Sequence, residues 1–247
     1  MNQVVVKQEK SGYQIVEAYK SLRTNLQFCG EDKKVIAVTS CTPNEGKSSV
    51  SMQLGISLAE SGKRVILIDA DLRKSVLLGR TKTQKSVRGL AHFLSGQATL
   101  EDVICSTNVK NFYMIYSGPF PPNPAELLGG KNFRSLLNAL RKVYDYVIVD
   151  TPPLGSVIDS AIVAEICDGS IMVIESGVIS YRFAQEVKSQ LERSNCPLLG
   201  VVLNKVDMQK QAYGKYGKYG QYKYGDYGQR GGQRNADHPH AFVEHAA

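Results

Sequence analysis

Short apolar runs alternate along this chain with stretches in which apolar residues recur every three or four positions. A continuous apolar run of about four to eight residues is typical of a strand buried on both faces, whereas the wider spacing is typical of a helix with one buried face. The runs predict strands over residues 35–39, 64–69, 112–116, 146–150, 170–175 and 198–203. The spacing predicts helices over residues 14–28, 48–61, 131–143 and 180–193, with two short ones near 89–95 and 99–105.

Buried strands that alternate with amphipathic helices predict an α/β fold, in which a parallel sheet is flanked by helices on both faces. Ligands of such folds bind beyond the carboxyl ends of the strands. The polar motifs of this chain directly follow predicted strands. The sequence therefore predicts one functional site at that edge of the sheet.

The pattern stops near residue 207. Residues 211–247 contain no Leu or Ile, and residues 213–228 consist of Tyr and Gly interspersed with Lys, Gln and Asp. Such a segment buries too little apolar surface to offset the entropy of ordering it. We expect a folded domain over residues 1–208 and a disordered tail over residues 209–247.

Charge and cysteine content narrow the class of protein. The net charge is +7, and residues 209–234 hold six Lys and Arg against one acid, which gives this stretch +5. The mildly basic remainder does not require a nucleic-acid partner, and none is expected. Five cysteines without a CxxC pair favour a reducing compartment. The sequence has no apolar run near the ~18 residues that span a bilayer and no signal-peptide start, so we expect a cytoplasmic protein.

Residues 41–48 follow a predicted strand and open a predicted helix. They match the phosphate-loop pattern GxxxxGK(S/T), except that Cys41 replaces the first Gly. Backbone N–H groups and a helix N-terminus attract phosphate, Lys47 would bridge the β- and γ-phosphates, and the Ser48 hydroxyl would bind Mg²⁺. The expected nucleotide-binding residues here are Pro43, Asn44, Glu45, Gly46, Lys47, Ser48 and Ser49.

Three aspartates follow two other strands. Asp69 and Asp71 stand two apart, so in an extended chain their side chains point the same way. Asp150 ends an apolar run and precedes Thr-Pro-Pro, the arrangement of a Walker B carboxylate. Asp71 could accept a proton from the substrate or could be a second Mg²⁺ ligand, and we favour the first. The expected metal ligands are Ser48, Asp69 and Asp150, and the expected catalytic residues are Lys47, Asp71 and Arg73.

The last predicted strand ends in Asn204-Lys-Val-Asp207, which is similar to the base-reading NKxD motif of GTPases. In an α/β fold of this kind we expect Asn204 to contact the edge of an adenine and Asp207 to be incidental. The expected nucleotide is therefore ATP, with Mg²⁺.

Taken together, the motifs at 40–48, 65–73, 121–128 and 147–153 and the tyrosine cluster resemble the bacterial tyrosine kinases of capsule and exopolysaccharide synthesis. These are P-loop NTPases of the partition-ATPase-like superfamily, and their loops often carry Gly where this chain has Asn44. The resemblance implies an ATP-dependent protein-tyrosine kinase that autophosphorylates its tail in trans and regulates polysaccharide synthesis or export. The implied phosphorylation sites are Tyr213, Tyr216, Tyr219, Tyr222, Tyr224 and Tyr227.

The same resemblance implies partners. Glu17, Lys20 and Arg23 would form an oligomerisation motif that builds a ring-like homo-oligomer, although the family prefers Arg, with its two-pronged guanidinium, at position 20. A separate membrane-embedded activator of the polysaccharide chain-length type would hold the kinase at the inner face of the cell membrane. A cognate tyrosine phosphatase and other tyrosine-phosphorylated proteins complete the implied set.

Two other classes remain open from the sequence. A partition- or positioning-type ATPase switch has the same fold, with a basic tail that binds DNA or membrane, but it carries a second phosphate-loop lysine where this chain has Thr42. A structural nucleotide-binding scaffold would require one of the three motifs to be inactive.

The tail also suggests a regulatory hypothesis. Each phosphotyrosine adds about −1.5 to −2 charges, so six would change +5 to roughly −4 to −7. We expect an unmodified tail to dock near the acidic Asp69 and Asp71 of a neighbouring subunit, and multisite phosphorylation to dissolve that assembly.

Overall fold

The computed structural model describes residues 2–7, 12–83 and 87–206. The described residues all belong to one compact unit. The predicted tail, its six tyrosines and Asp207 lie outside the described residues.

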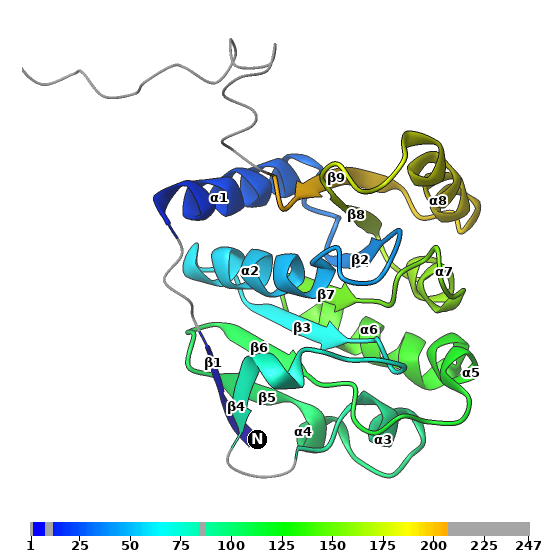
Figure 1. Ribbon diagram of the computed structural model, residues 1–247. Coiled ribbons are helices and arrows are strands. Elements are labelled where there is room, and N and C mark those ends of the chain that lie inside the picture. The colour runs from blue at the N-terminus through cyan, green and yellow to red at the C-terminus, as the bar shows by residue number, and fades with distance from the viewer. Residues whose placement is uncertain (1, 8–11, 84–86, 207–247) are drawn as a thin grey trace, which may run out of the picture. The chain divides into compact units, whose positions relative to one another are not determined.

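One mixed sheet of nine strands forms the centre of the described domain (Figure 1). The strand order is β4-β1-β5-β6-β3-β7-β2-β8-β9. The strands are β1 (Asn2–Val6), β2 (Val35–Ser40), β3 (Val65–Asp69), β4 (Thr81–Thr83), β5 (Cys105–Thr107), β6 (Phe112–Ile115), β7 (Tyr146–Asp150), β8 (Gly169–Glu175) and β9 (Leu198–Asn204).

The predicted parallel sheet is confirmed for its larger part and corrected at one edge. The six strands from β6 to β9 in the sheet order run parallel to one another. At the other edge β4 is antiparallel to β1 and β5 is antiparallel to β6. The sequence did not predict β1, β4 and β5, because strands of three to five residues carry too few apolar positions to show a period.

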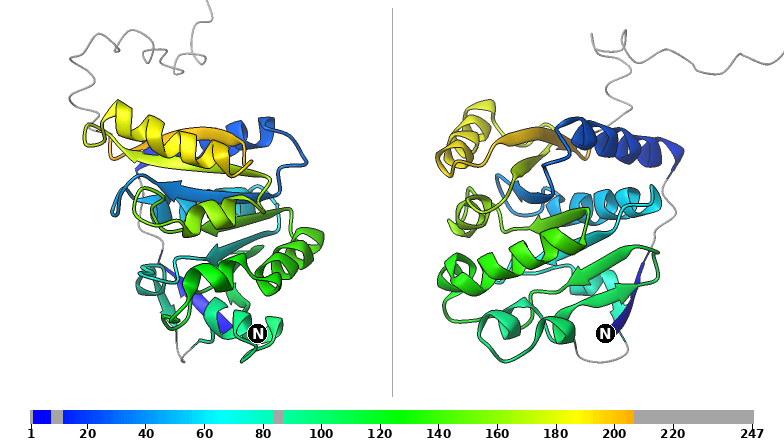
Figure 2. Two further views of the ribbon diagram at one scale, coloured as in Figure 1. Left: turned by 90° about the vertical axis from the view of Figure 1, so that its right-hand side faces the viewer. Right: turned by 180° about the vertical axis from the view of Figure 1, so that it is seen from behind.

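Helices cover both faces of the sheet, with α1 and α2 on one face and α5 to α8 on the other (Figures 1 and 2). The helices are α1 (Tyr13–Phe28), α2 (Lys47–Glu60), α3 (Leu90–Leu94), α4 (Leu100–Val103), α5 (Pro124–Gly129), α6 (Lys131–Val143), α7 (Asp159–Ala164) and α8 (Tyr181–Arg193), with a 3₁₀ turn, η1 (Leu78–Arg80). The six-residue helices α5 and α7 were not predicted. In the described ranges no helix is both long and apolar enough to cross a membrane.

Alternating side chains of the central strands build two cores. Leu67 of β3 packs with Leu54 of α2 on one face. Its neighbour Ile66 packs with Phe133 of α6 on the other face. All four side chains are fully buried, and truncating any of them to Ala would cost about 2–5 kcal/mol. This two-sided packing fixes the strand ends that carry the polar motifs.

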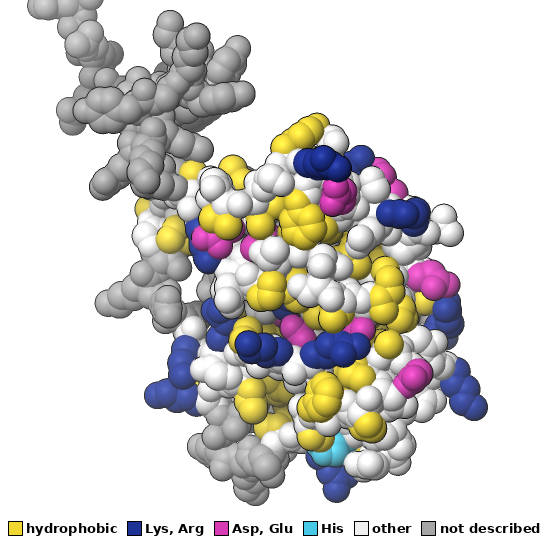
Figure 3. Space-filling view, turned by 45° about the vertical axis from the view of Figure 1, so that its right-hand side comes forward, with side chains coloured by type: hydrophobic (Ala, Val, Ile, Leu, Met, Phe, Trp, Pro, Cys, Tyr) yellow, Lys and Arg dark blue, Asp and Glu magenta, His cyan; other side chains and the backbone are white. Residues whose placement is uncertain are grey.

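Some large hydrophobic side chains stay on the surface. Hydrophobic side chains gather in the middle of the face shown in Figure 3, with lysines and arginines among and around them. The exposed hydrophobic residues include Tyr13, Ile15, Phe28, Leu78, Phe120, Ile158, Val178 and Tyr181.

Candidate functional site

The predicted phosphate loop connects the buried strand β2 to helix α2. Gly46 lies at the helix N-cap with φ +92°, a backbone conformation that favours glycine. A Cβ at Gly46 would also come within 2.1 Å of the Asn204 amide nitrogen. Asn44 also has a positive φ, of 68°. The loop is therefore shaped by its backbone, as a phosphate cradle made of N–H groups requires.

The unusual Cys41 of this loop is accommodated by packing. It does not have the positive φ that favours glycine, and its side chain is fully buried beside Leu154 and Met172. The close approach that the loop needs comes from the other side, because a Cβ at Gly155 would lie 2.3 Å from the Cys41 carbonyl oxygen. Cys41 therefore fits this position without a backbone conformation that would require glycine.

Lys47 lies at the centre of the site. Its ammonium nitrogen is 3.4 Å from Asp71 Oδ2, 3.6 Å from Asp150 Oδ2 and 3.3 Å from Ser48 Oγ. The lysine and both carboxylates are buried. The predicted residues of the first three motifs therefore meet, although they stand up to 103 positions apart between Lys47 and Asp150.

Asp69 and Asp150 end neighbouring parallel strands in the same register. Burial raises the pKa of Asp69 to about 7, and the nearby Asp150 adds to the rise. Burial also raises the pKa of Asp150, while Lys47 opposes that rise. Two buried acids side by side favour a cation between or beside them.

The contacts of these two acids fit a magnesium site. Asp69 Oδ2 accepts a hydrogen bond from the Ser75 hydroxyl, whereas its Oδ1 is buried and has no hydrogen-bond partner in the described part of the chain. Asp150 Oδ1 accepts a hydrogen bond of 3.1 Å from the Ser51 hydroxyl. Carboxylate and hydroxyl oxygens are the donors that Mg²⁺ prefers. No group of three or more His, Cys, Asp and Glu side chains in the described ranges could hold a metal by itself.

Asp71 differs from Asp69 although only one residue separates them. Asp71 Oδ1 accepts the backbone N–H of Lys74 at 2.9 Å, which leaves Oδ2 facing Lys47. The carboxylate is thus oriented by its own turn, with one oxygen toward Lys47.

Arg73 does not join the Lys47 cluster. Its Nε and Nη2 donate to the two oxygens of Asp159 at 2.8 and 3.0 Å. Asp159 is fully buried at the start of α7, and the next residue, Ser160, donates to the carbonyl oxygen of Pro152. The pair therefore ties the loop after β3 to the loop after β7. Asp159 was missed by sequence reasoning, and its only signal was an acid at the start of an unrecognised helix.

The end of β9 supports the phosphate loop. Asn204 Nδ2 donates to the Glu45 carbonyl oxygen at 2.8 Å, and Lys205 Nζ donates to the Asn44 carbonyl oxygen at 2.8 Å. The Glu45 carboxylate faces inward, where it accepts hydrogen bonds from Thr42 and from the Glu175 N–H. Glu45 can therefore reach a nucleotide only through its backbone, and the contact of Asn204 with adenine stays a prediction.

The predicted oligomerisation residues lie on α1, apart from this site. Lys20 Nζ is 2.8 Å from Glu17 Oε1, and both side chains are half exposed. Arg23 reaches across to α2 and donates to the Ser57 carbonyl oxygen at 2.8 Å. Leu26 is the one buried residue of this helix.

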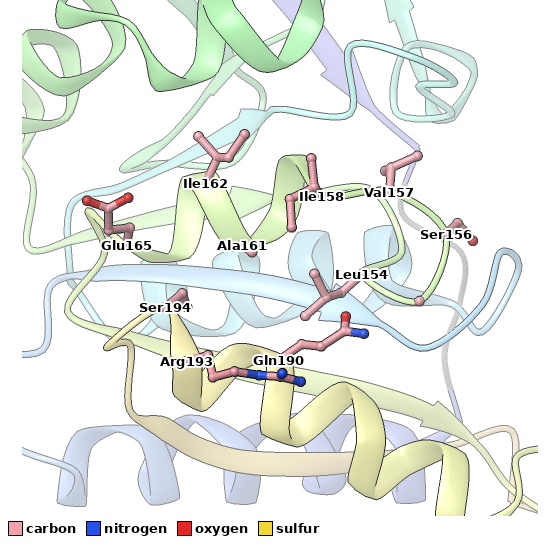
Figure 4. A pocket seen from close by; sticks show the side chains of 11 residues that line it. Leu154, Ser156, Val157, Ile158, Ala161, Ile162, Glu165, Gln190, Arg193 and Ser194 are labelled. Atoms are coloured by element: carbon pink, nitrogen blue, oxygen red, sulfur yellow. The ribbon is translucent and has the colours of Figure 1, made fainter.

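A separate groove of about 640 Å³ lies between α7 and α8, shown in Figure 4. Gln190 and Arg193 of α8 line one side, and Ile158, Ile162 and Glu165 line the other. None of the predicted site residues lines this groove.

Comparisons with known proteins identify relatives of this chain. The sequence family described as AAA domain matches residues 33–193. The tyrosine-protein kinase CpsD of Streptococcus pneumoniae is 46% identical over 198 residues, which cover 80% of this chain and 87% of that protein.

Solved structures with a fold similar to that of this chain include the following two. The kinase domain of the Escherichia coli tyrosine kinase ETK has a TM-score of 0.72 and 33% identity, over 78% of this chain and 77% of that chain. The septum site-determining protein MinD of Pyrococcus horikoshii, complexed with Mg-ADP, has a TM-score of 0.59 and 24% identity, over 69% of each chain. The likeness to MinD concerns the fold alone.

Proposed function

Because the chain belongs to the family of bacterial tyrosine-protein kinases, we propose that it transfers the γ-phosphate of ATP to tyrosine side chains, including those of its own C-terminal segment. The observation that carries this proposal is the position of Lys47, whose ammonium lies within 3.6 Å of both Asp71 and Asp150 at the start of α2. A cation held there between two acids is placed to meet the phosphates of a nucleotide.

Each side chain has a distinct task in this proposal. The N–H groups of residues 43–49 bind the phosphates, and Lys47 exchanges its carboxylate partners for the β- and γ-phosphates. Ser48, Asp150 and Asp69 would hold Mg²⁺, which supplies charge neutralisation at the phosphates. Asn204 holds the loop through Glu45 and lies near enough to the loop to contact the base.

The transfer step has a proton acceptor in Asp71. The phenolic oxygen of tyrosine, with a pKa of about 10, carries its proton at neutral pH. As the bond from this oxygen to the γ-phosphorus forms, the bond from that phosphorus to the bridging oxygen of ADP breaks, and the phenolic proton passes to an Asp71 oxygen. Asp71→Asn should then lower kcat while leaving the affinity for Mg·ATP nearly unchanged; a large loss of affinity would make Asp71 a metal ligand instead.

The proposal also includes the substrates of the kinase, its activator and the phosphatase that opposes it. It phosphorylates the tail tyrosines at 213–227 in trans and controls capsular or exopolysaccharide synthesis. A separate membrane-embedded activator holds it at the inner face of the cell membrane, and a cognate phosphatase reverses the modification. Other tyrosine-phosphorylated proteins are further substrates.

Transfer in trans requires that two subunits meet, and α1 is the helix through which we expect them to do so. The first half of this helix exposes Tyr13, Ile15 and Val16, which is unusual for a helix that packs only within its own chain. We propose that α1 meets a neighbouring subunit in a ring-like homo-oligomer, with Glu17, Lys20 and Arg23 in the contact. Both Asp69 and Asp71 are buried, and the tail lies outside the described residues, so its docking near these carboxylates stays a prediction.

Mixing a variant that lacks kinase activity with a variant that lacks the tail acceptors tests both kinase activity and transfer in trans. One is full-length Lys47→Met, and the other has all six tail tyrosines changed to Phe. When either variant is incubated by itself with ATP and Mg²⁺, its tail should gain no phosphotyrosine. In the mixture, the Lys47→Met chain should gain phosphotyrosine, which an intact-mass measurement detects. A mixture without phosphotyrosine, when wild type modifies itself, would show transfer within one chain.

The partition-type ATPase has less support. Thr42, at the place of the second lysine of those switches, is occupied by hydrogen bonds to the Glu45 carboxylate. Slow ATP hydrolysis by wild type without any phosphotyrosine would favour that class.

A further inference from the structure

A cavity of about 500 Å³ opens beside the loop that follows β3. We call it the β6-side cavity, and its lining includes Leu72, Arg73, Lys74, Leu78, Tyr116 and Phe120. The volume lies in the range of about 300–1,000 Å³ that is common for ligand sites. It exceeds what one tyrosine side chain fills, so it can also take the residues on either side.

The strand order places this cavity on the side of β3 away from the phosphate loop. The phosphate loop follows β2, and Asn204, which supports that loop, ends β9. On the other side of β3 lies β6, with Ile68 of β3 beside Ile115 of β6, so residues 116–120 leave the sheet next to Asp69 and Asp71. Phosphoryl transfer needs the attacking and leaving oxygens roughly in line. A nucleotide that enters over β2 and β9 therefore leaves the β6 side for the acceptor.

The lining suits an aromatic acceptor. Most of the surface that lines the cavity is apolar. Phe120 and Leu78 are 65% and 53% exposed, which leaves an aromatic and an aliphatic face at the rim without a partner in the described residues. A tyrosine ring that packs there would cover both, and aromatic pairs gain from such contact.

The wall that carries Phe120 is held in place before any substrate binds. Leu90 N–H donates to the Tyr116 carbonyl oxygen at 2.6 Å, and Ala91 N–H donates to the Ser117 carbonyl oxygen at 2.8 Å. The Tyr116 hydroxyl donates to Thr81 Oγ1 at 2.8 Å. Phe120 then leads directly into the proline-rich motif at 121–128, for which the proposed function gives no task. We infer that this motif positions Phe120 at the rim of the cavity.

Charge adds a preference for the sequence around the tyrosine. Arg73 is engaged by Asp159, whereas the exposed Lys74 forms no ion pair in the described part of the chain. The lining includes no Asp or Glu. The rim is therefore positive, and an acidic residue next to the acceptor would be favoured by about three-fold, as surface ion pairs are weak.

We propose that the β6-side cavity binds the acceptor tyrosine of protein substrates, with Phe120 against its ring and Lys74 selecting an acidic neighbour. This inference rests on the proposed kinase function and adds the substrate class to it. The six tail tyrosines differ in this respect, because only Tyr227 directly follows an acid, Asp226. Tyr227 is therefore the tail site that is phosphorylated first.

The first test measures the KM of an acceptor peptide. Full-length kinase with Phe120→Ala should show a KM for a tyrosine peptide raised roughly ten-fold, from the lost ring contact, with the KM for ATP unchanged. Tyr181→Ala is the matched control, since Tyr181 is an exposed aromatic residue at the start of α8 and outside this lining. An unchanged peptide KM in Phe120→Ala would overturn the proposal.

The second test measures charge preference with two peptides that carry Glu or Lys on both sides of one tyrosine. Wild type should prefer the Glu peptide about three-fold, and Lys74→Glu should reverse that order. Mapping the order of tail phosphorylation by mass spectrometry gives the same answer without a peptide, since Tyr227 should lead in wild type and lose its lead in Lys74→Glu. A preference that Lys74→Glu leaves unchanged overturns the proposal, whereas wild type that binds ATP but forms no phosphotyrosine contradicts the kinase function itself.

Discussion

The phosphate site and helix α1 both contain lysine–carboxylate pairs, yet the pairs differ in what they contribute. The Glu17–Lys20 contact on α1 is shorter, at 2.8 Å, than the 3.4 Å contact of Lys47 with Asp71. The α1 pair, however, is 42–50% exposed, whereas the side chains of Lys47 and Asp71 are 11% and 8% exposed. Water screens the attraction within the first pair and hardly reaches the second. The burial of a pair, and not its distance, therefore decides which attraction is stronger.

The largest effect is expected from removing the buried lysine. Lys47→Met should lower tyrosine phosphorylation more than about 100-fold, because it removes a charge from a preorganised, water-poor site. The circular dichroism spectrum should stay that of the folded protein, since α2 is held by apolar packing. Lys63→Met, at an exposed position just beyond the same helix, is the control. Equal activity of Lys47→Met and Lys63→Met would contradict the assignment of Lys47 to the catalytic site.

Breaking the buried pair next to the site comes second. Asp159→Asn weakens a two-point contact with Arg73 and should lower the free energy of unfolding by about 2 kcal/mol, measured by urea denaturation. It should also lower kcat, because the loop that orients Asp71 loses its anchor. Asp32→Asn removes a highly exposed carboxylate and should change neither quantity. Equal stability of the two variants would mean that Arg73 and Asp159 do not depend on each other.

A pH titration of stability sharpens the comparison further. The pKa of Asp69 is raised to about 7 from 3.8, so between these values the folded state holds a proton that the unfolded state has released. Stability contributed by this proton is fully present below pH ~3.8 and is lost as the pH rises through about 7. The melting temperature of the nucleotide- and Mg²⁺-free protein should therefore fall with rising pH in this window, and Asp69→Asn should flatten the curve. Parallel curves for the two proteins would contradict the buried environment of Asp69.

The smallest effect is expected on α1. Lys20→Ala should leave the melting temperature of dilute protein unchanged, because the exposed pair is screened. Light scattering at high concentration is the sharper measurement, and it should show weaker self-association. A clear drop in melting temperature at all dilutions would show that the pair stabilises the single chain instead.

The sequence predicted the parts of this site that depend on local pattern. Buried runs placed Asp69 and Asp150 at strand ends, and the GKS core placed Lys47 at a helix start. The contrast between Asp69 and Asp71 could not be predicted, because it depends on which carboxylate Ser75 and the Lys74 N–H reach. Ion pairs between residues far apart along the chain could not be predicted either.

Asp159 illustrates that limit. It lies 86 positions after Arg73, on a six-residue helix whose apolar pattern is too short to recognise. The short strands β1, β4 and β5 were missed for the same reason. What a sequence shows well is periodic burial, and what it hides are contacts between short elements far apart along the chain.

The cysteine in the phosphate loop has a consequence for chemical probing. Thiol-directed reagents and peroxide attack the thiolate, and burial raises the pKa of Cys41 to about 11, with the charge of Glu45 adding to the rise. The side chain is also closed off from solvent beneath Leu154. Alkylating agents that inactivate enzymes through a nucleotide-site cysteine should therefore spare this one, and the kinase should keep its ATP site through oxidative episodes that modify more accessible thiols.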